Sequence, residues 1–155
     1  MTNQIDIPSG AKIKVVGVGG GGSNAVSRMY RERMPSVEYL VINTDTQALL
    51  KCDVPLRISI GDQLTEGKGV GGNPEKGARA ANESREQLFE SLSDVDMVFV
   101  AAGMGGGTGT GAAPGIAEIA KQTGALTVGV VTTPFLFEGT RRMKNAKEGL
   151  SLIHI

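Results

Sequence analysis

The segment MVFVAAGMGGGTGTGAAP, from Met97 to Pro114, joins an apolar run to a loop that holds six glycines. The run Asp96–Ala102 is rich in β-branched and aromatic residues, which predicts a buried strand. A helix is predicted after the glycines, because Ile116, Ile119 and Ala120 repeat at helical spacing. A strand, a glycine loop and a helix in direct succession form the building unit of an α/β protein.

The same succession recurs along the chain. Strands are predicted over Lys12–Val18, Tyr39–Ile42, Val54–Ile60, Asp96–Ala102 and Leu126–Val131. Helices are predicted over Ser23–Arg33 with Ser23 as N-cap, around Ala48–Leu50, over Pro74–Ser91 with Asn73 as N-cap, after Gly111 and over Glu138–Ile153. Strands that alternate with helices imply an α/β fold with a doubly wound, mostly parallel sheet and helices on both faces. Pro55 indicates an edge position for the third strand, and Met29, Phe89 and Met143 are predicted to be core residues.

Composition excludes several classes of protein. The 155 residues suit one domain, and 16 basic residues balance 16 acidic ones, which does not favour a nucleic-acid partner. Cys52 has no second cysteine to pair with, and the start of the chain lacks the pattern of a signal peptide. Glycines interrupt the longest uncharged stretch, so no membrane insertion is expected. A cytoplasmic location is the expectation from these features.

Glycine is concentrated in three loops. The chain has 23 glycines, and sixteen of them lie in Gly17–Gly22, Gly61–Gly72 and Gly103–Gly111. In a doubly wound sheet, the loops that follow the strands meet at the carboxyl edge, and ligands bind where the strand order reverses. We therefore expect Gly19–Gly22 and Gly103–Gly111 to face one another, with Gly69–Gly72 beside them. Glycine loops and helix N-termini present N–H groups to anions, so three such loops predict several bound phosphates.

From the residues alone, three interpretations of the loops stay open. Gly17, Gly19 and Gly22 match the dinucleotide fingerprint, with Asp45 near the position of a ribose-binding acid, which favours an NAD-dependent oxidoreductase. The run GGGTGTG instead adds the hydroxyls of Thr108 and Thr110 to a phosphate nest at the fourth strand, as in a nucleotide-binding protein. Tight turns in an interaction module that binds no nucleotide are the third interpretation. A Walker-type NTPase is excluded, because no segment has the P-loop spacing.

Five motifs resemble those of the FtsZ family, bacterial relatives of tubulin that assemble at the division site. The resemblance runs from about Lys12 to about Leu150 and rests on GVGGGGSNAV (Gly17–Val26), INTD (Ile42–Asp45), GGNPEKG (Gly71–Gly77), MVFVAAGMGGGTGTGAAP (Met97–Pro114) and LTVGVVTTPFLFEG (Leu126–Gly139). It implies a Rossmann-like fold of the tubulin/FtsZ type, with a GTP-binding domain over residues 12–150. It also implies GTP or GDP as ligand with Mg²⁺ bound through the phosphates, hydrolysis of GTP to GDP and phosphate, and head-to-tail self-assembly into the cytokinetic ring at midcell with other cell-division proteins.

The resemblance also implies a set of nucleotide-binding residues. Gly20, Gly21, Gly22, Ser23 and Asn24 would bind the phosphates and the sugar, and Gly71 and Gly72 the γ-phosphate. The main phosphate cradle would consist of Gly105, Gly106, Gly107, Thr108 and Gly109. Glu138 and Arg142 would contact the sugar and the base. Val70, Thr133 and Ser23 depart from the residues usual in the family. Taken without the resemblance, a surface ion pair at i,i+4 is the favoured interpretation of Glu138 and Arg142. Asn43 and Asp45 are equally turn formers or neighbours of a nucleotide-bound magnesium.

The resemblance further implies what this chain lacks. In the family, an Asp beyond this domain binds guanine, and an acidic loop of a second domain completes catalysis on the neighbouring subunit. No catalytic residue is therefore expected within the 155 residues, and the chain alone is predicted to be inactive. Residues 1–11 are expected to be a flexible N-terminal segment, and residues 151–155 a truncated or non-native end.

Overall fold

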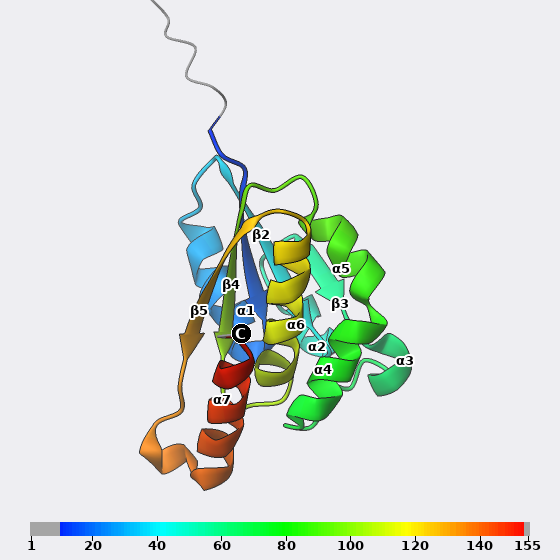
Figure 1. The fold of residues 1–155 in the computed structure, drawn as a ribbon, viewed down its shortest axis with the longest axis vertical. Helices are drawn as coiled ribbons and strands as arrows, with labels where there is room; N and C mark the ends of the chain where they lie inside the picture. The colour runs from blue at the N-terminus through cyan, green and yellow to red at the C-terminus, as the bar shows by residue number, and fades with distance from the viewer. Residues whose placement is uncertain (1–9, 154–155) are drawn as a thin grey trace, which may run out of the picture.

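A parallel β-sheet forms the centre of the computed structural model, which describes residues 10–153 (Figure 1). Its strands are β1 (Ile13–Val18), β2 (Val37–Asn43), β3 (Leu56–Ser59), β4 (Met97–Gly103) and β5 (Leu126–Thr132), in the order β3-β2-β1-β4-β5. Every neighbouring pair is parallel, which confirms the predicted sheet, and β3 lies at an edge as Pro55 indicated. Most of the predicted flexible segment 1–11, and residues 154–155 of the predicted end, lie outside the described residues; residues 151–153 close the last helix.

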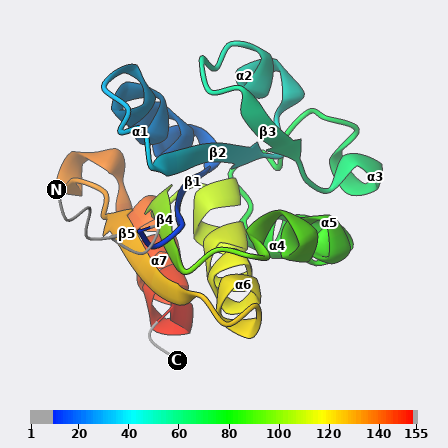
Figure 2. The same ribbon diagram turned by 90° about the horizontal axis from the view of Figure 1, so that it is seen from above.

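Helices cover both faces of the sheet, as predicted (Figure 2). They are α1 (Gly19–Arg31), α2 (Thr46–Leu50), α3 (Asp62–Thr65), α4 (Pro74–Glu83), α5 (Arg85–Leu92), α6 (Thr108–Gln122), the 3₁₀ helix η1 (Leu136–Glu138) and α7 (Thr140–Ile153). In Figure 2, α1 and α2 lie on one side of the sheet and α4, α5, α6 and α7 on the other. Within residues 10–153, no helix combines the length and apolar composition that crossing a membrane requires.

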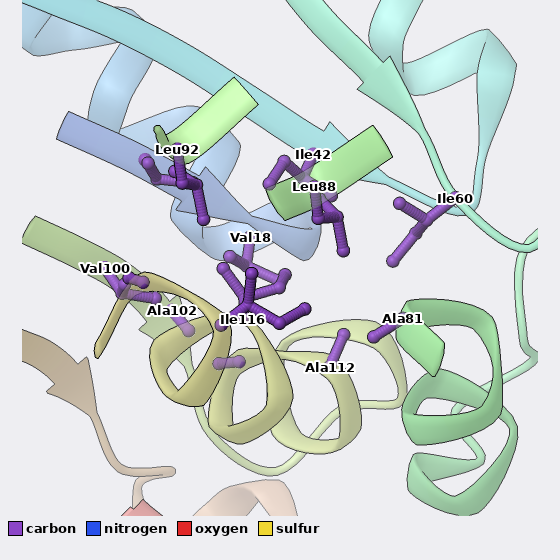
Figure 3. Packing of buried hydrophobic residues seen from close by; sticks show 14 of the residues in the cluster. Val18, Ile42, Ile60, Ala81, Leu88, Leu92, Val100, Ala102, Ala112 and Ile116 are labelled. Atoms are coloured by element: carbon purple, nitrogen blue, oxygen red, sulfur yellow. The ribbon is translucent and has the colours of Figure 1, made fainter. Parts of the chain in front are cut away.

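The two faces of the sheet bury separate hydrophobic clusters. Successive strand residues point to opposite faces, so Val15 belongs to the cluster under α1, and Val16 to the cluster under α4, α5 and α6. The cluster under α4, α5 and α6 is the larger one, and in Figure 3 Ile116 of α6 lies next to Val18 of the sheet. A fully buried side chain of this size contributes about 1.5–3 kcal/mol to stability, so these clusters hold the strand ends in place.

Three predicted helix boundaries were wrong, each for a local reason. Helix α1 begins at Gly19 and its N-cap is Val18, because the helix starts directly at the end of β1 and leaves Ser23 inside it. The predicted helix Pro74–Ser91 is two helices that meet at Ser84, whose hydroxyl accepts the N–H of Gly61 from outside the helix at 3.1 Å. The predicted start of the last helix at Glu138 was also wrong.

That last helix begins two residues later, because Gly139 has a φ of 102°, a conformation that ends η1 before α7 starts at Thr140. The N-cap at Asn73 was predicted correctly, since its side chain accepts the backbone N–H groups of Glu75 and Lys76.

Some predicted core residues are exposed. Met29 and Phe89 are 46% and 44% exposed, so their assignment to the core was wrong, whereas Met143 is half-buried. Helix α1 packs on β1, β2 and β4. Leu126 and Val130 of the edge strand β5 remain 61% and 55% exposed. The apolar surface of the sheet therefore extends beyond the helix that covers its centre.

Candidate functional site

A cavity of about 610 Å³ opens at the carboxyl edge of the sheet, the edge to which the strand arrowheads point in Figure 1. It lies where β1 and β4 are neighbours, with Val18 paired to Ala102. The helix that follows β1 covers one face of the sheet and the helix that follows β4 covers the other, so the strand order reverses here. The lining residues are Val18, Gly20, Gly21, Asn43, Thr44, Asp45, Ala48, Lys68, Gly69, Val70, Gly71, Gly72, Gly103, Met104, Gly106, Gly107, Thr108, Gly109, Thr132, Thr133, Pro134, Glu138 and Arg142. All three glycine loops contribute to this one cavity, as expected.

The first loop divides into residues that face the cavity and residues that pack behind it. Gly20 and Gly21 line the cavity. Gly22 is buried, and a Cβ there would collide with the carbonyl oxygen of Ala101 in β4, so this glycine lets α1 approach the sheet. Ser23 is 8% exposed and its hydroxyl has no hydrogen-bond partner among residues 10–153, while Asn24 is exposed; neither lines the cavity.

The loop that follows β4, within Gly103–Gly111, leads into the N-terminus of α6. Gly106, Gly107 and Gly109 line the cavity beside Thr108, which is the first residue of the helix. Gly105 lies in an adjoining pocket of about 150 Å³, together with Gly71, Gly72, Gly106, Arg141, Arg142 and Asn145. Free N–H groups at the start of a helix favour an anion. This loop therefore presents hydrogen-bond donors that suit an anion.

Thr110 differs from the expectation that both threonines of GGGTGTG face the ligand. Its Oγ1 accepts the backbone N–H of Gly105 at 2.7 Å, and the residue is 2% exposed. Gly105 has a φ of 116°, in the region that favours glycine. The Thr110 hydroxyl thus stabilises the turn of the loop and is directed away from the cavity.

The third loop, Gly69–Gly72, is attached to the end of β2. The N–H of Gly69 donates to the carbonyl oxygen of Thr44 at 3.2 Å, and the N–H of Thr46 donates to that of Gly67 at 3.1 Å. Gly71 and Gly72 have φ values of 62° and 75°, so the backbone turns in a way that residues with a side chain rarely adopt. The strand end therefore fixes where this loop meets the cavity.

Thr44 is a residue of the site that sequence reasoning missed. It is 1% exposed, and its Oγ1 lies 2.7 Å from Oγ1 of Thr108. The motif INTD placed Thr44 in a turn, and nothing in the sequence pointed to a partner 64 residues away. The pairing of β2 with β1, and of β1 with β4, brings the two hydroxyls together.

Asn43 and Asp45 are turn formers that also line the cavity. The Asn43 side-chain oxygen accepts the N–H groups of Thr44 and Asp45 at 2.8 and 3.3 Å. A carboxylate oxygen of Asp45 accepts the N–H of Ala48 at 3.1 Å and so caps α2. Asn43 and Asp45 therefore stabilise the turn after β2, the first of the two predicted alternatives.

Glu138 of η1 and Arg142 of α7 form a further part of the cavity wall. Their side chains are 3.8 Å apart across i,i+4, and a Glu138 carboxylate oxygen also accepts the N–H of Phe135 at 2.6 Å. The i,i+4 ion pair is thus present, and both residues line the cavity. Thr133, where the family usually has a basic residue, lines it as well.

The charges of the cavity wall are balanced. Asp45 and Glu138 oppose Lys68 and Arg142, and Lys68 is itself paired with Glu66 at 3.1 Å. The positive potential for a phosphate therefore comes mainly from backbone N–H groups and from the N-termini of α1 and α6. Within residues 10–153, no three His, Cys, Asp or Glu side chains are grouped so that they could hold a metal ion.

A parallel sheet with glycine loops and two helix N-termini around one cavity defines an α/β nucleotide-binding domain. The chain belongs to the Tubulin/FtsZ family, because the model of the family's GTPase domain matches residues 12–154. It is 57% identical over 150 residues to the cell division protein FtsZ of Buchnera aphidicola subsp. Schizaphis graminum, covering 97% of this chain and 39% of that protein. The FtsZ of subsp. Baizongia pistaciae is 54% identical over 151 residues, with the same coverage. The chain thus spans about two fifths of the length of these relatives.

Solved structures agree with the family. An empty FtsZ dimer of M. jannaschii superimposes with a TM-score of 0.90 at 51% identity, covering 93% of this chain and 42% of that one. CetZ2 of Haloferax volcanii, a protofilament with GTPγS bound, has a TM-score of 0.82 at 27% identity, with coverages of 92% and 46%. None of these matches supports the dinucleotide-dependent oxidoreductase.

Proposed function

We propose that residues 12–150 form a domain that binds GTP and GDP at the cavity between β1 and β4. The observation that carries the proposal is that three glycine loops and the N-termini of two long helices line one cavity. One glycine loop would suffice for a dinucleotide. Three loops suit a chain of phosphates, and membership of a GTPase family supports guanine as the base.

The lining residues suggest roles within the proposed site. Gly20 and Gly21 at α1, and Gly106–Gly109 at α6, would donate N–H groups to the phosphates. Gly71 and Gly72 would contact the terminal phosphate, with Gly105 in the adjoining pocket, and Glu138 and Arg142 would contact the ribose. Gly22, Ser23 and Asn24 lie beside the cavity wall, and we assign them to support of the first loop.

Magnesium fits this site through the nucleotide rather than through a set of protein ligands. Asp45 and Glu138 are the lining carboxylates, and within the described part of the chain no cluster of three ligand side chains exists. Mg²⁺ accepts one or two carboxylates together with phosphate oxygens and water. Bound to phosphates, it would neutralise their charge.

We propose that GTP is hydrolysed to GDP and phosphate at a site completed by a neighbouring subunit, and hardly at all by this chain alone. Both lining carboxylates are engaged: Asp45 caps α2, and Glu138 binds Arg142 and the N–H of Phe135. These bonds give both carboxylates a structural role, which favours the positioning of the attacking water by another group. Catalysis of phosphoryl transfer depends on such positioning, so the missing group would come from a neighbouring subunit.

We further propose that the protein assembles head to tail and acts with other cell-division proteins in the midcell ring. Phe135, Leu136 and Phe137 are 69%, 91% and 85% exposed, directly before the lining residue Glu138. An apolar surface of this kind indicates a protein contact. Solved relatives include a dimer and a protofilament, which supports contact with a second copy.

Calorimetric titration of the 155-residue chain with GTP, GDP, ATP and NAD tests the proposal. Binding of GTP and GDP is expected, with only weak preference over ATP, since the guanine-binding Asp expected from the family lies outside this chain. Binding of NAD without any response to GTP would overturn the assignment. A folded chain that binds none of the four would overturn it too.

A further inference from the structure

We propose that Thr44 is a positioning residue that directs the hydroxyl of Thr108 toward a phosphate of the bound nucleotide. The inference rests on the proposed function and deepens it, because it adds to the site a residue outside the three glycine loops. Thr44 directly follows β2, next to the loop Gly69–Gly72 and to the loop Gly103–Gly111.

The geometry leaves the Thr44 hydroxyl one partner. Its Oγ1 lies 2.7 Å from Oγ1 of Thr108, and this is the hydrogen bond that the described residues offer it. Thr44 borders the cavity but is only 1% exposed, so water has little access to its hydroxyl. Thr108 is 8% exposed and lines the cavity. The pair thus forms a short chain that leads from the interior to the ligand.

The number of protons available decides which of the two hydroxyls donates in this pair. A threonine hydroxyl has one proton to donate, and a phosphate oxygen only accepts. When Thr44 donates to Thr108, the proton of Thr108 is free for the phosphate. In the opposite direction, Thr108 presents lone pairs to an anion, which is repulsive. A bound phosphate therefore selects donation from Thr44, and the two successive bonds strengthen one another.

The backbone of Thr44 adds a second link. Its carbonyl oxygen accepts the N–H of Gly69 at 3.2 Å, and the Thr65 hydroxyl donates to the same oxygen at 3.5 Å. The third glycine loop and the phosphate loop are thus fixed to one residue. Replacing Thr44 by valine removes the hydroxyl and leaves these backbone bonds possible, so the substitution isolates the proposed role.

A double-mutant cycle on binding tests the inference. GDP affinity is measured by calorimetry for the wild-type chain, Thr44→Val, Thr44→Ser, Thr108→Val and the double valine variant. Circular dichroism gives the folded fraction, so that affinity is expressed per folded molecule. Thr108→Val is expected to weaken binding about tenfold or more, because it removes a bond to a charged group. Thr44→Val should weaken it about three- to tenfold, and Thr44→Ser less than about twofold.

The decisive comparison is Thr44→Val in the Thr108→Val background, where no further loss is expected because Thr44 acts through the missing hydroxyl. An equal loss in both backgrounds, or a serine variant as weak as the valine variant, would show a merely structural role and overturn the inference. Wild-type affinity in Thr44→Val would overturn it as well. A wild-type chain that binds no GDP would instead overturn the proposed function.

Should Thr44→Val fail to fold, NMR of the wild-type chain provides a second test. On addition of GDP, the hydroxyl proton of Thr108 is expected to shift, while that of Thr44 stays protected from exchange. A Thr108 hydroxyl proton that is unchanged by GDP, in a chain that binds it, would contradict the inference.

Discussion

The N–H of Gly105 donates to Oγ1 of Thr110 at 2.7 Å, which joins the glycine loop after β4 to the first turn of α6. Thr110→Val leaves this N–H buried without a partner, at a cost of about 1–3 kcal/mol in the free energy of unfolding. Thr110→Ser retains the hydroxyl and should lose less. Urea denaturation without nucleotide measures both, and a valine variant as stable as the wild type would show that another group satisfies Gly105.

Gly111 and Gly115 of α6 form a matched pair for packing. A Cβ at Gly111 would collide with the carbonyl oxygen of Pro74 in α4, whereas at Gly115 it would meet the Cβ of Ala81 at 3.8 Å, an ordinary contact. Gly111→Ala should therefore destabilise the chain by about 1–3 kcal/mol. Gly115→Ala should stabilise it by up to about 1 kcal/mol through helix propensity. Thermal unfolding compares the two, and equal effects would contradict the close approach of the helices.

The strands and the location of the site were predictable from sequence, because buried parallel strands are apolar runs and glycine loops mark their carboxyl ends. Side-chain roles inside the loops were less predictable. Thr108 and Thr110 are two residues apart in GGGTGTG. One of them lines the cavity, and the other holds the backbone of Gly105. Only the three-dimensional turn of the loop distinguishes them.

Tertiary packing explains the wrong core predictions and the contact that was not predicted. Helical spacing placed Met29 and Phe89 on apolar faces, but it does not define how far the neighbouring layer reaches, and both side chains extend past it. The contact between Thr44 and Thr108 depends on the order of the strands. A single sequence contains no local pattern for such a contact between distant segments.

Substitution of Gly106 tests the proposed phosphate contact without affecting the fold. A Cβ there meets no atom within 4 Å, and its φ lies outside the positive range that disfavours other residues. Gly106→Ala should leave the stability of the free chain within about 0.5 kcal/mol. It should weaken GDP binding about fivefold or more, because the methyl group enters the space of the phosphate.

The control for Gly106 is Gly10→Ala, at an exposed position that is also free of contacts. It should change neither stability nor affinity. Unchanged GDP affinity in Gly106→Ala would place the phosphates elsewhere in the cavity.

Leu136 tests the apolar surface beside the cavity. It is 91% exposed, and Leu50 of α2, 70% exposed, serves as the control. Neither Leu136→Ser nor Leu50→Ser should change the free energy of unfolding by more than about 0.5 kcal/mol. In sedimentation velocity over a range of concentrations, the Leu136 variant should self-associate less than the Leu50 variant. A wild-type chain that self-associates, with both variants associating equally, would remove this surface from the proposed contact.

The strand order β3-β2-β1-β4-β5 has a consequence for the order in which the protein opens. β1 and β4 are hydrogen-bonded to neighbours along both edges, while β3 and β5 are each paired on one side among the described strands. Amides of doubly paired strands exchange with solvent mainly through global unfolding, and those of edge strands through local fluctuations. The glycine loops that follow β1 and β4 are thus attached to the slowest-exchanging part of the molecule, and local opening of the edge strands would leave their attachment intact.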